Sequence, residues 1–144
     1  MKLPKLSVLI ALSIVMLSKQ CLANDEKQVE VLTRLAESYV HAQFNFDQAL
    51  LKSITSPQFV EISPKGEIDE RNRVLAFYSE DKRVSSPPFN IVDVRVRKDG
   101  SSAFISQVII IEVGNRKVEM TQGLSAIKKE QTWLLTSSQS TPKK

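Results

Sequence analysis

Glu61 and Tyr39 are the residues of this sequence best suited to acid–base chemistry. A carboxylate can take a proton and a phenol can donate a hydrogen bond to a developing oxyanion, which is what an isomerase, cyclase or dehydratase requires. Glu61 shares the strand parity of Phe59, so it enters a pocket only if Phe59 does. Acids are seldom buried without a partner, and we therefore favour Glu61 in solvent, with Val60 and Ile62 facing inward.

A neutral set of polar side chains is expected to point inward instead. Alternation along the penultimate predicted strand places Met120 and Gln122 on one face. Together with Gln107, Tyr39 and Gln43 they form the predicted ligand-binding set, with amide and phenol tips in apolar walls. Such a lining suits a small, mostly apolar molecule held by a few hydrogen bonds. Alternatively, the glutamines are core amides that satisfy one another or the backbone.

Other reactive residue types are too sparse for a metal centre, a phosphate loop or a nucleophilic triad. His41 is the single histidine and falls on the polar arc of the first predicted helix, where a solvated side chain is expected. Asp69 is interpreted as a helix cap, and Asp93 as a surface partner on a strand. The sequence therefore predicts no metal and no cofactor.

The first two dozen residues predict where the protein works. Met1–Lys5 is basic, Leu6–Leu17 is an apolar run, and the small residue Ala23 precedes an acidic stretch. This pattern is typical of a secretory signal peptide, which we expect to be cleaved near Ala23. A dozen residues span only about 18 Å as a helix, short of the roughly 30 Å of bilayer hydrocarbon. The protein is thus predicted to be periplasmic or secreted.

Cleavage would change the bulk properties of the chain. The formal charge of +4 falls to about +1, with 17 basic against 16 acidic residues, because three lysines leave with the signal. That balance gives no support to nucleic-acid binding. The only cysteine, Cys21, leaves as well. An acylated Cys21 is the alternative, but Lys19 and Gln20 stand where small apolar residues should precede it.

The mature chain is predicted to be one α+β domain over residues 24–141, with a disordered tail at 142–144. Its first helix covers residues 26–45, with Tyr39 and Gln43 on the apolar arc. The other predicted elements are helices at 46–51 and 70–79 and strands at 58–63, 90–97, 102–113, 117–129 and 131–140. The expected architecture is a cone-shaped, curved antiparallel (mixed) sheet wrapped around three helices.

One predicted strand does not alternate. Residues Val108–Ile111 are apolar on both faces, so both faces should be covered. The helices can cover one face only. We expect a second copy of the chain to cover the other, which predicts a homodimer formed through the sheet. The alternative is that the domain covers this patch with its own tail.

Residues along nearly the whole mature chain resemble one superfamily. They are Tyr39, Ala42 and Asp47; Phe59 and Val60 with Gly66 and Asp69; Ile91–Val96 leading into Gly100 and Ala103; and Trp133–Leu135 leading into Ser138–Thr141. The order and spacing of these segments resemble those of sequences in the nuclear transport factor 2-like superfamily. The resemblance is greatest to its small bacterial branch, which is related to SnoaL-like polyketide cyclases and ketosteroid isomerases. The resemblance implies a cone of sheet around a pocket.

The resemblance implies no single activity, because this architecture hosts both enzymes and binding proteins. Two departures weaken the enzymatic interpretation: Pro57-Gln58 replaces acidic residues that often precede the first strand, and Gln122-Gly123 replaces a polar or charged pair. We expect an exported, non-catalytic module that binds a small ligand or serves an accessory role. The alternatives are an isomerase-type enzyme with Glu61 as base and Tyr39 as donor, and a protein-interaction module with a filled pocket. No membrane contact is expected after cleavage.

Overall fold

The computed structural model describes the backbone of residues 6–143 and the side chains of residues 24–143. Its internal contacts divide the chain into two units, residues 1–31 and residues 32–144. The first unit holds the beginning of helix α1 (Leu6–Asn45). The side chains of the predicted signal peptide, including Cys21, lie outside the described residues. Among the helices that are described, none combines the length and apolar character needed to cross a bilayer.

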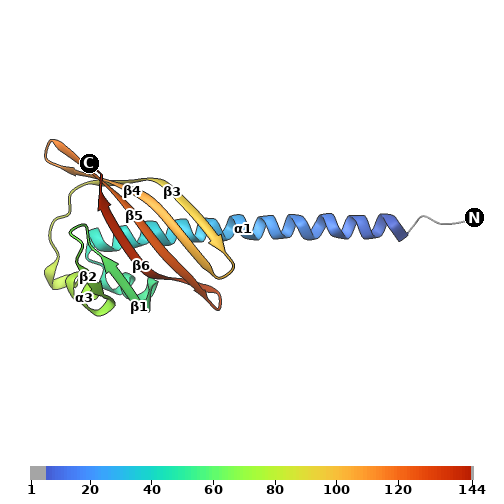
Figure 1. Cartoon of the computed structure of the whole chain (residues 1–144), viewed down its shortest axis with the longest axis horizontal. Helices are drawn as coiled ribbons and strands as arrows, with labels where there is room; N and C mark the ends of the chain where they lie inside the picture. The colour runs from blue at the N-terminus through green and yellow to red at the C-terminus, as the bar shows by residue number, and fades with distance from the viewer. Residues whose placement is uncertain (1–5, 144) are drawn as a thin grey trace, which may run out of the picture. The chain divides into compact units, whose positions relative to one another are not determined.

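The second unit has helices on one face of a curved, mixed sheet, as the sequence predicts (Figure 1). Besides the end of α1, its elements are α2 (Gln48–Ile54), β1 (Thr55–Ile62), β2 (Ile68–Glu70), α3 (Arg71–Phe77), β3 (Phe89–Asp99), β4 (Ser102–Val113), β5 (Arg116–Lys129) and β6 (Thr132–Pro142). The strand order is β2-β1-β6-β5-β4-β3. Only β1 and β6 pair in parallel, and the other neighbours are antiparallel.

The core forms where the apolar arc of α1 meets the inner face of the sheet. Fully buried residues from α1, β1, β4, β5 and β6 pack there, including Leu32, Tyr39, Phe59, Ile105, Leu124 and Leu135. Burying one such leucine or isoleucine stabilises the fold by about 1.5–3 kcal/mol. The chain leaves α1 through Phe46, at a positive φ of 53°. Asp47 then caps α2 by accepting a hydrogen bond from the Leu50 amide at 2.9 Å.

Asp69 is not the helix cap that the sequence predicts. It lies in β2, directly opposite Glu61 of β1, and its Oδ1 is 2.8 Å from Arg73 Nε. The chain stays extended through Glu70 because β2 pairs with β1. Helix α3 therefore begins one residue later, and Glu70 at its N-cap makes no side-chain capping bond.

Two further predictions about the strands are wrong. Asp93 has a positive φ of 53° within a bulge of β3, so Val92 pairs with Val108 on the outer face while Val94 and Val96 remain inside. Strict alternation had placed all three valines on one face. At the other end of the chain, β6 extends to Pro142 and the Lys143 amide donates to the Glu119 carbonyl at 2.9 Å. Residues 142 and 143 are thus ordered by β5, and Lys144 lies outside the described residues.

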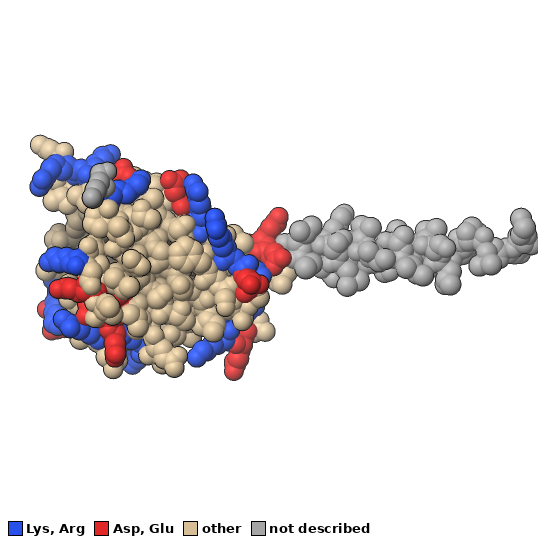
Figure 2. Space-filling view, in the orientation of Figure 1, with Lys and Arg blue, Asp and Glu red and all other residues tan. Residues whose placement is uncertain are grey.

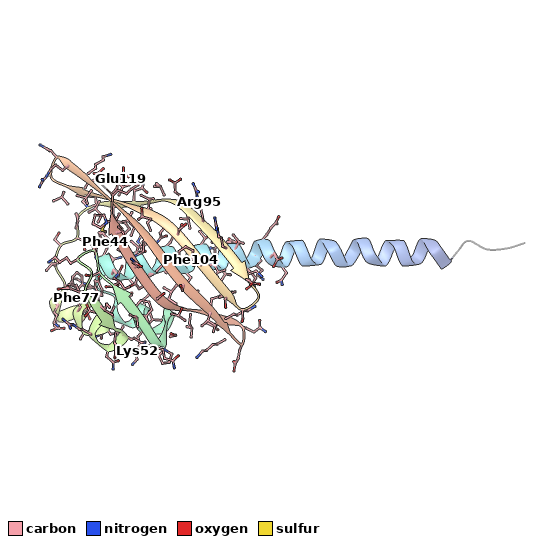
Figure 3. The ribbon with its side chains drawn as sticks, viewed as in Figure 1. Phe44, Lys52, Phe77, Arg95, Phe104 and Glu119 are labelled. Atoms are coloured by element: carbon pink, nitrogen blue, oxygen red, sulfur yellow. The ribbon has the colours of Figure 1, made fainter. Side chains whose placement is uncertain are left out.

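The outer face of the sheet is broad and uncharged at its centre. Figure 2 shows this area without Lys, Arg, Asp or Glu side chains and with charged groups along its border. Phe104 of β4 lies on it with 49% of its surface exposed, and Arg95 of β3 marks the edge (Figure 3). The Phe104 ring covers Gly123 of β5, where an added Cβ would come within 3.0 Å of the ring.

Candidate functional site

A cavity of about 270 Å³ lies between the end of α1, the sheet and the loop that precedes β3. Its walls come from α1, β1, β4, β5, β6, the Tyr78 C-cap of α3 and the connecting loops. The lining residues are Gln43, Phe44, Glu61, Pro64, Tyr78, Val84, Ser85, Ser86, Pro87, Ile109, Met120, Gln122 and Ser140. Most of the lining surface is apolar, and Glu61 is the only charged residue among those that line it.

The loop wall of the cavity is fixed at two points. The Ser86 hydroxyl donates to the backbone carbonyl of Phe44 at the end of α1. Two residues later, the Pro88 carbonyl accepts a hydrogen bond of 2.9 Å from the Glu112 amide of β4. The segment Val84–Pro87 is therefore tied to a helix and to the sheet, and it forms one side of the cavity.

Glu61 faces this cavity, which corrects the expectation that it lies in solvent. Phe59, two residues earlier on β1, is buried in the core with 1% of its surface exposed. Side chains two apart on a strand share a face, so Glu61 follows Phe59 inward. The usual cost of burying a carboxyl group is offset here by hydrogen bonds from α1, which the strand pattern alone does not reveal.

Two residues of α1 hold the Glu61 carboxyl group. The Tyr39 hydroxyl donates to Glu61 Oε2, and Gln43 Nε2 donates to the same oxygen at 2.7 Å. Tyr39 and Gln43 stand four residues apart, which puts them on one helical face. The Gln43 amide nitrogen also lies 3.0 Å from the Tyr78 hydroxyl oxygen and 3.2 Å from that of Tyr39. One amide thus ties together a carboxyl group and two phenols.

Burial has the largest influence on the pKa of the Glu61 carboxyl group. It raises the pKa of Glu61 above its ordinary value of 4.5, and the nearby Asp69 carboxylate raises it further. The hydrogen bonds from Tyr39 and Gln43 act in the opposite direction. Burial and the neighbouring Glu61 raise the pKa values of Tyr39 and Tyr78 as well, so both phenols keep their protons near neutral pH.

One oxygen of Glu61 is left for a ligand. Both hydrogen bonds to its carboxyl group end on Oε2, and Oε1 receives none from the residues that the structure describes. The Tyr78 hydroxyl lines the cavity and accepts from Gln43, which leaves its own proton to donate. The site can therefore offer an acceptor on Glu61 and a donor on Tyr78.

The predicted ligand-binding residues separate into two groups. Gln43, Met120 and Gln122 line the cavity, whereas Tyr39 and Gln107 are fully buried behind it. Gln107 Nε2 donates to Gln122 Oε1 at 2.8 Å, and Gln122 Nε2 donates to Ser140 Oγ at 3.2 Å. The glutamine side chains thus hydrogen-bond to one another, as in the alternative interpretation, but Gln107 Oε1 is buried without a partner among the described residues and Gln122 also lines the cavity.

Tyr78 is the site residue that the sequence did not single out. It was placed on the inner side of the third predicted helix, but with no polar role. In the structure it is the C-cap that follows α3, and its ring packs against that of Phe46 with centroids 5.7 Å apart. A phenol on an apolar face close to a chain reversal is the only sequence signal that could have suggested it.

His41 and the acidic side chains that the structure describes do not form a metal site. The His41 side chain is exposed and its ring packs edge-on against Phe89, with centroids 5.0 Å apart. In the part of the chain that the structure describes, no group of three or more His, Cys, Asp or Glu side chains is arranged to hold a metal ion.

Similar architecture occurs in solved structures. A nuclear transport factor 2-like protein from Cytophaga hutchinsonii superposes with a TM-score of 0.68 at 16% identity, over 79% of this chain and 97% of that one. The protein has the nuclear transport factor 2-like fold. A candidate ketosteroid isomerase from Parabacteroides distasonis superposes with a TM-score of 0.62 at 10% identity, over 76% of this chain and 85% of that one.

A third neighbour of this nuclear transport factor 2-like domain is the CaMKII hub of S. rosetta. Its TM-score is 0.67 at 12% identity, over 79% of this chain and 95% of that one. No protein-family model and no curated protein matches the sequence. At such low identities these structures establish the fold alone, and the function has to be argued from the site.

Proposed function

We propose that the protein binds a small, mostly apolar molecule in the cavity beside Glu61. The observation that carries this proposal is the Glu61 carboxyl group, which Tyr39 and Gln43 hold against the wall of an otherwise uncharged cavity. Burying the Glu61 carboxyl group costs desolvation energy. A ligand that forms a hydrogen bond with the second oxygen of this group would offset part of that cost. Tyr78 supplies a donor for a second polar contact.

The dimensions and walls of the cavity support binding. About 270 Å³ of space bounded by Phe44, Ile109, Met120 and two prolines suits the apolar body of a small molecule. An open cavity of this size also argues against the alternative of a filled pocket. Binding energy would come from the apolar walls, and orientation from Glu61 and Tyr78.

A cavity-filling variant tests binding directly. We expect native mass spectrometry of the purified protein to show an additional small mass, and Met120→Trp to lose it because the larger side chain occupies the cavity. Lys52→Trp is the matched control, since Lys52 is exposed on α2, outside the cavity lining, and should retain the mass. A wild-type protein without any bound molecule would contradict the proposal.

A second candidate function is proton transfer at carbon. It is favoured by the raised pKa of Glu61, since a base works best with a pKa close to the working pH. Glu61 Oε1 would take a proton next to a carbonyl group, and the Tyr78 hydroxyl would donate to the developing oxyanion. Tyr39 is less suited to that donor role than the sequence implied, because its proton is already used by Glu61.

Deuterium exchange tests this second function. The protein should accelerate the exchange of the α-protons of cyclohexanone with D2O, followed by proton NMR. Glu61→Gln should abolish the acceleration, and Tyr78→Phe should lower it by about 10- to 1000-fold, as expected for the loss of one oxyanion donor. Exchange no faster than in buffer would leave only the binding function.

Export is part of the proposal. It is supported by the basic start of the chain, the apolar run Leu6–Leu17 and the small residue Ala23. We propose that the protein works in the periplasm or outside the cell after cleavage near Ala23. Its mass after purification from the periplasm fixes the cleavage point, and an added acyl mass on Cys21 would instead favour a lipoprotein.

We also propose a homodimer formed through the outer face of the sheet. Support comes from the exposed Phe104 ring at the centre of an uncharged face and from the apolar residues Val108 and Ile110 on the same side of β4 (Figures 2 and 3). A hub domain among the structural neighbours is compatible with self-association. Exposed apolar faces of this kind commonly mark protein interfaces.

A further inference from the structure

Glu61 has no cationic partner among the residues that the structure describes. Of the residues that line the cavity, none is a lysine, arginine or histidine. Within the described part of the chain the carboxyl group is bound only by the neutral donors Tyr39 and Gln43. Buried charges in proteins are ordinarily paired with an opposite charge, because neutral hydrogen bonds replace only part of the lost hydration. When Glu61 is ionised, the cavity therefore contains an anionic group whose counter-ion the described residues do not provide.

The neighbouring strand adds to the negative character of this place. Asp69 of β2 is directly opposite Glu61 of β1, and its charge acts on the Glu61 carboxyl group. A second hollow of about 310 Å³ shares Glu61, Pro64 and Tyr78 with the cavity and includes Asp69. Arg73 is paired with Asp69, and the exposed Lys65 lines the second hollow but not the cavity.

Aromatic side chains complete a surface that attracts cations. Phe44 and Tyr78 both line the cavity with Glu61. The faces of such rings carry negative charge density and stabilise ammonium groups within about 6 Å. An anionic ligand would meet the Glu61 carboxylate and these two aromatic rings, with no positive group among the lining residues to offset them.

Resting on the proposed binding function, we infer that the ligand is an organic amine: its ammonium group pairs with Glu61 Oε1, and its apolar body fills the space beside Phe44, Ile109 and Met120. The Tyr78 ring flanks the ammonium group. Tyr39 acts as a positioning residue, since it holds Oε2 and leaves Oε1 directed to the ligand. The site thus selects its ligand by a positive charge and by the volume of the apolar part.

Three probes of similar size and different charge test this inference. 2-Phenylethylamine, 2-phenylethanol and phenylacetate share a phenyl ring and a short chain. Dissociation constants are measured by titration, following the 13C-labelled methyl group of Met120, which lines the cavity. Its signal is assigned with Met120→Leu. We expect the amine to bind at least about tenfold more tightly than the alcohol, as a charge-assisted hydrogen bond provides, and phenylacetate to bind most weakly.

Variants identify the group responsible. Glu61→Gln keeps the size of the side chain and removes its charge. The amine and the alcohol should then bind with about equal dissociation constants, and the alcohol should bind as it does to wild type. Glu130→Gln is the matched control, because Glu130 is exposed in the turn between β5 and β6 and lines neither the cavity nor the second hollow, and it should keep the preference. Circular dichroism verifies that each variant is folded.

The outcomes separate this inference from the function on which it rests. If the amine and the alcohol bind wild type equally well, or if Glu61→Gln keeps the preference, the cation inference is wrong and the binding function stands. If none of the three probes shifts the Met120 signal at millimolar concentration, both are wrong. A preference for the amine that disappears only in Glu61→Gln supports both.

Discussion

The hydroxyl group of Tyr39 donates a hydrogen bond to the carboxyl group of Glu61, across the interface between α1 and β1. Tyr39 is fully buried, and its ring packs on Phe59 with centroids 5.7 Å apart. The apolar part of the side chain thus belongs to the core, and its polar tip belongs to the site. This double role links the orientation of Glu61 to the packing of the helix on the sheet.

Tyr39→Phe separates the two roles, because it keeps the ring and removes only the hydroxyl group. We expect the free energy of unfolding to fall by about 1–3 kcal/mol at pH 8, the cost of losing a hydrogen bond to a buried charged group. At acidic pH, where Glu61 is protonated, the loss should be smaller. Urea denaturation at both pH values measures it.

Tyr78→Phe is the control for this prediction. Among the described residues, the Tyr78 hydroxyl accepts only from the Gln43 amide and makes no bond to Glu61, so its removal should cost less and depend little on pH. An equal loss at both pH values in Tyr39→Phe would mean that the hydroxyl does not act through the Glu61 charge.

The raised pKa of Glu61 predicts how stability depends on pH. Between its ordinary value of 4.5 and its value in the folded protein, the folded state binds more protons than the unfolded state. The free energy of unfolding therefore falls as the pH rises through this window, by at most about 1.4 kcal/mol per pH unit for one group. Below pH 4.5 the stabilising contribution is fully present.

Glu61→Gln should remove this pH dependence. The difference in free energy of unfolding between wild type and variant, measured by urea denaturation from pH 4 upward, should change steadily in favour of the variant until Glu61 is ionised in the folded state. Parallel curves over the whole range would show that burial does not shift the pKa of Glu61.

Periodicity was sufficient to predict the class of the fold but not the direction of Glu61. The apolar arc of α1 and the alternation in β4 and β5 identify a sheet with helices on one face. On β1, however, Phe59 alternates with Val60 and Ile62, so either face could be the inner one. The choice depends on which face α1 covers and on the donors Tyr39 and Gln43, which are about 20 residues away in sequence.

Residues at the ends of elements were also beyond prediction. Tyr78 caps the end of α3, and its hydroxyl lies at the cavity beside Gln43 Nε2 of α1, a contact 35 residues away in sequence. Similarly, the bulge at Asp93 reverses the face of Val92. Both features arise from tertiary contacts, and local sequence preferences do not report on these.

Phe104→Glu tests the proposed dimer. The substitution puts a charge at the centre of the uncharged outer face, and burying that charge against a second copy would cost far more than the apolar contact supplies (Figure 3). We expect wild type to sediment as a dimer at high micromolar concentration and the variant as a folded monomer. Gln131→Glu, in the exposed turn between β5 and β6, is the control and should stay dimeric. A monomeric wild type would contradict the proposal.

The buried amide pair Gln107–Gln122 should be strongly coupled. Gln107 Nε2 donates to Gln122 Oε1 at 2.8 Å, and both side chains have about 1% of their surface exposed. Gln107→Leu leaves the Gln122 oxygen without this donor in the core, so we expect a loss of about 1–3 kcal/mol in the free energy of unfolding. Replacing both glutamines with leucine removes both polar groups, and the double variant should lose less than the sum of the single losses. A double-mutant cycle in urea measures the coupling, and strict additivity would show that the two amides contribute independently.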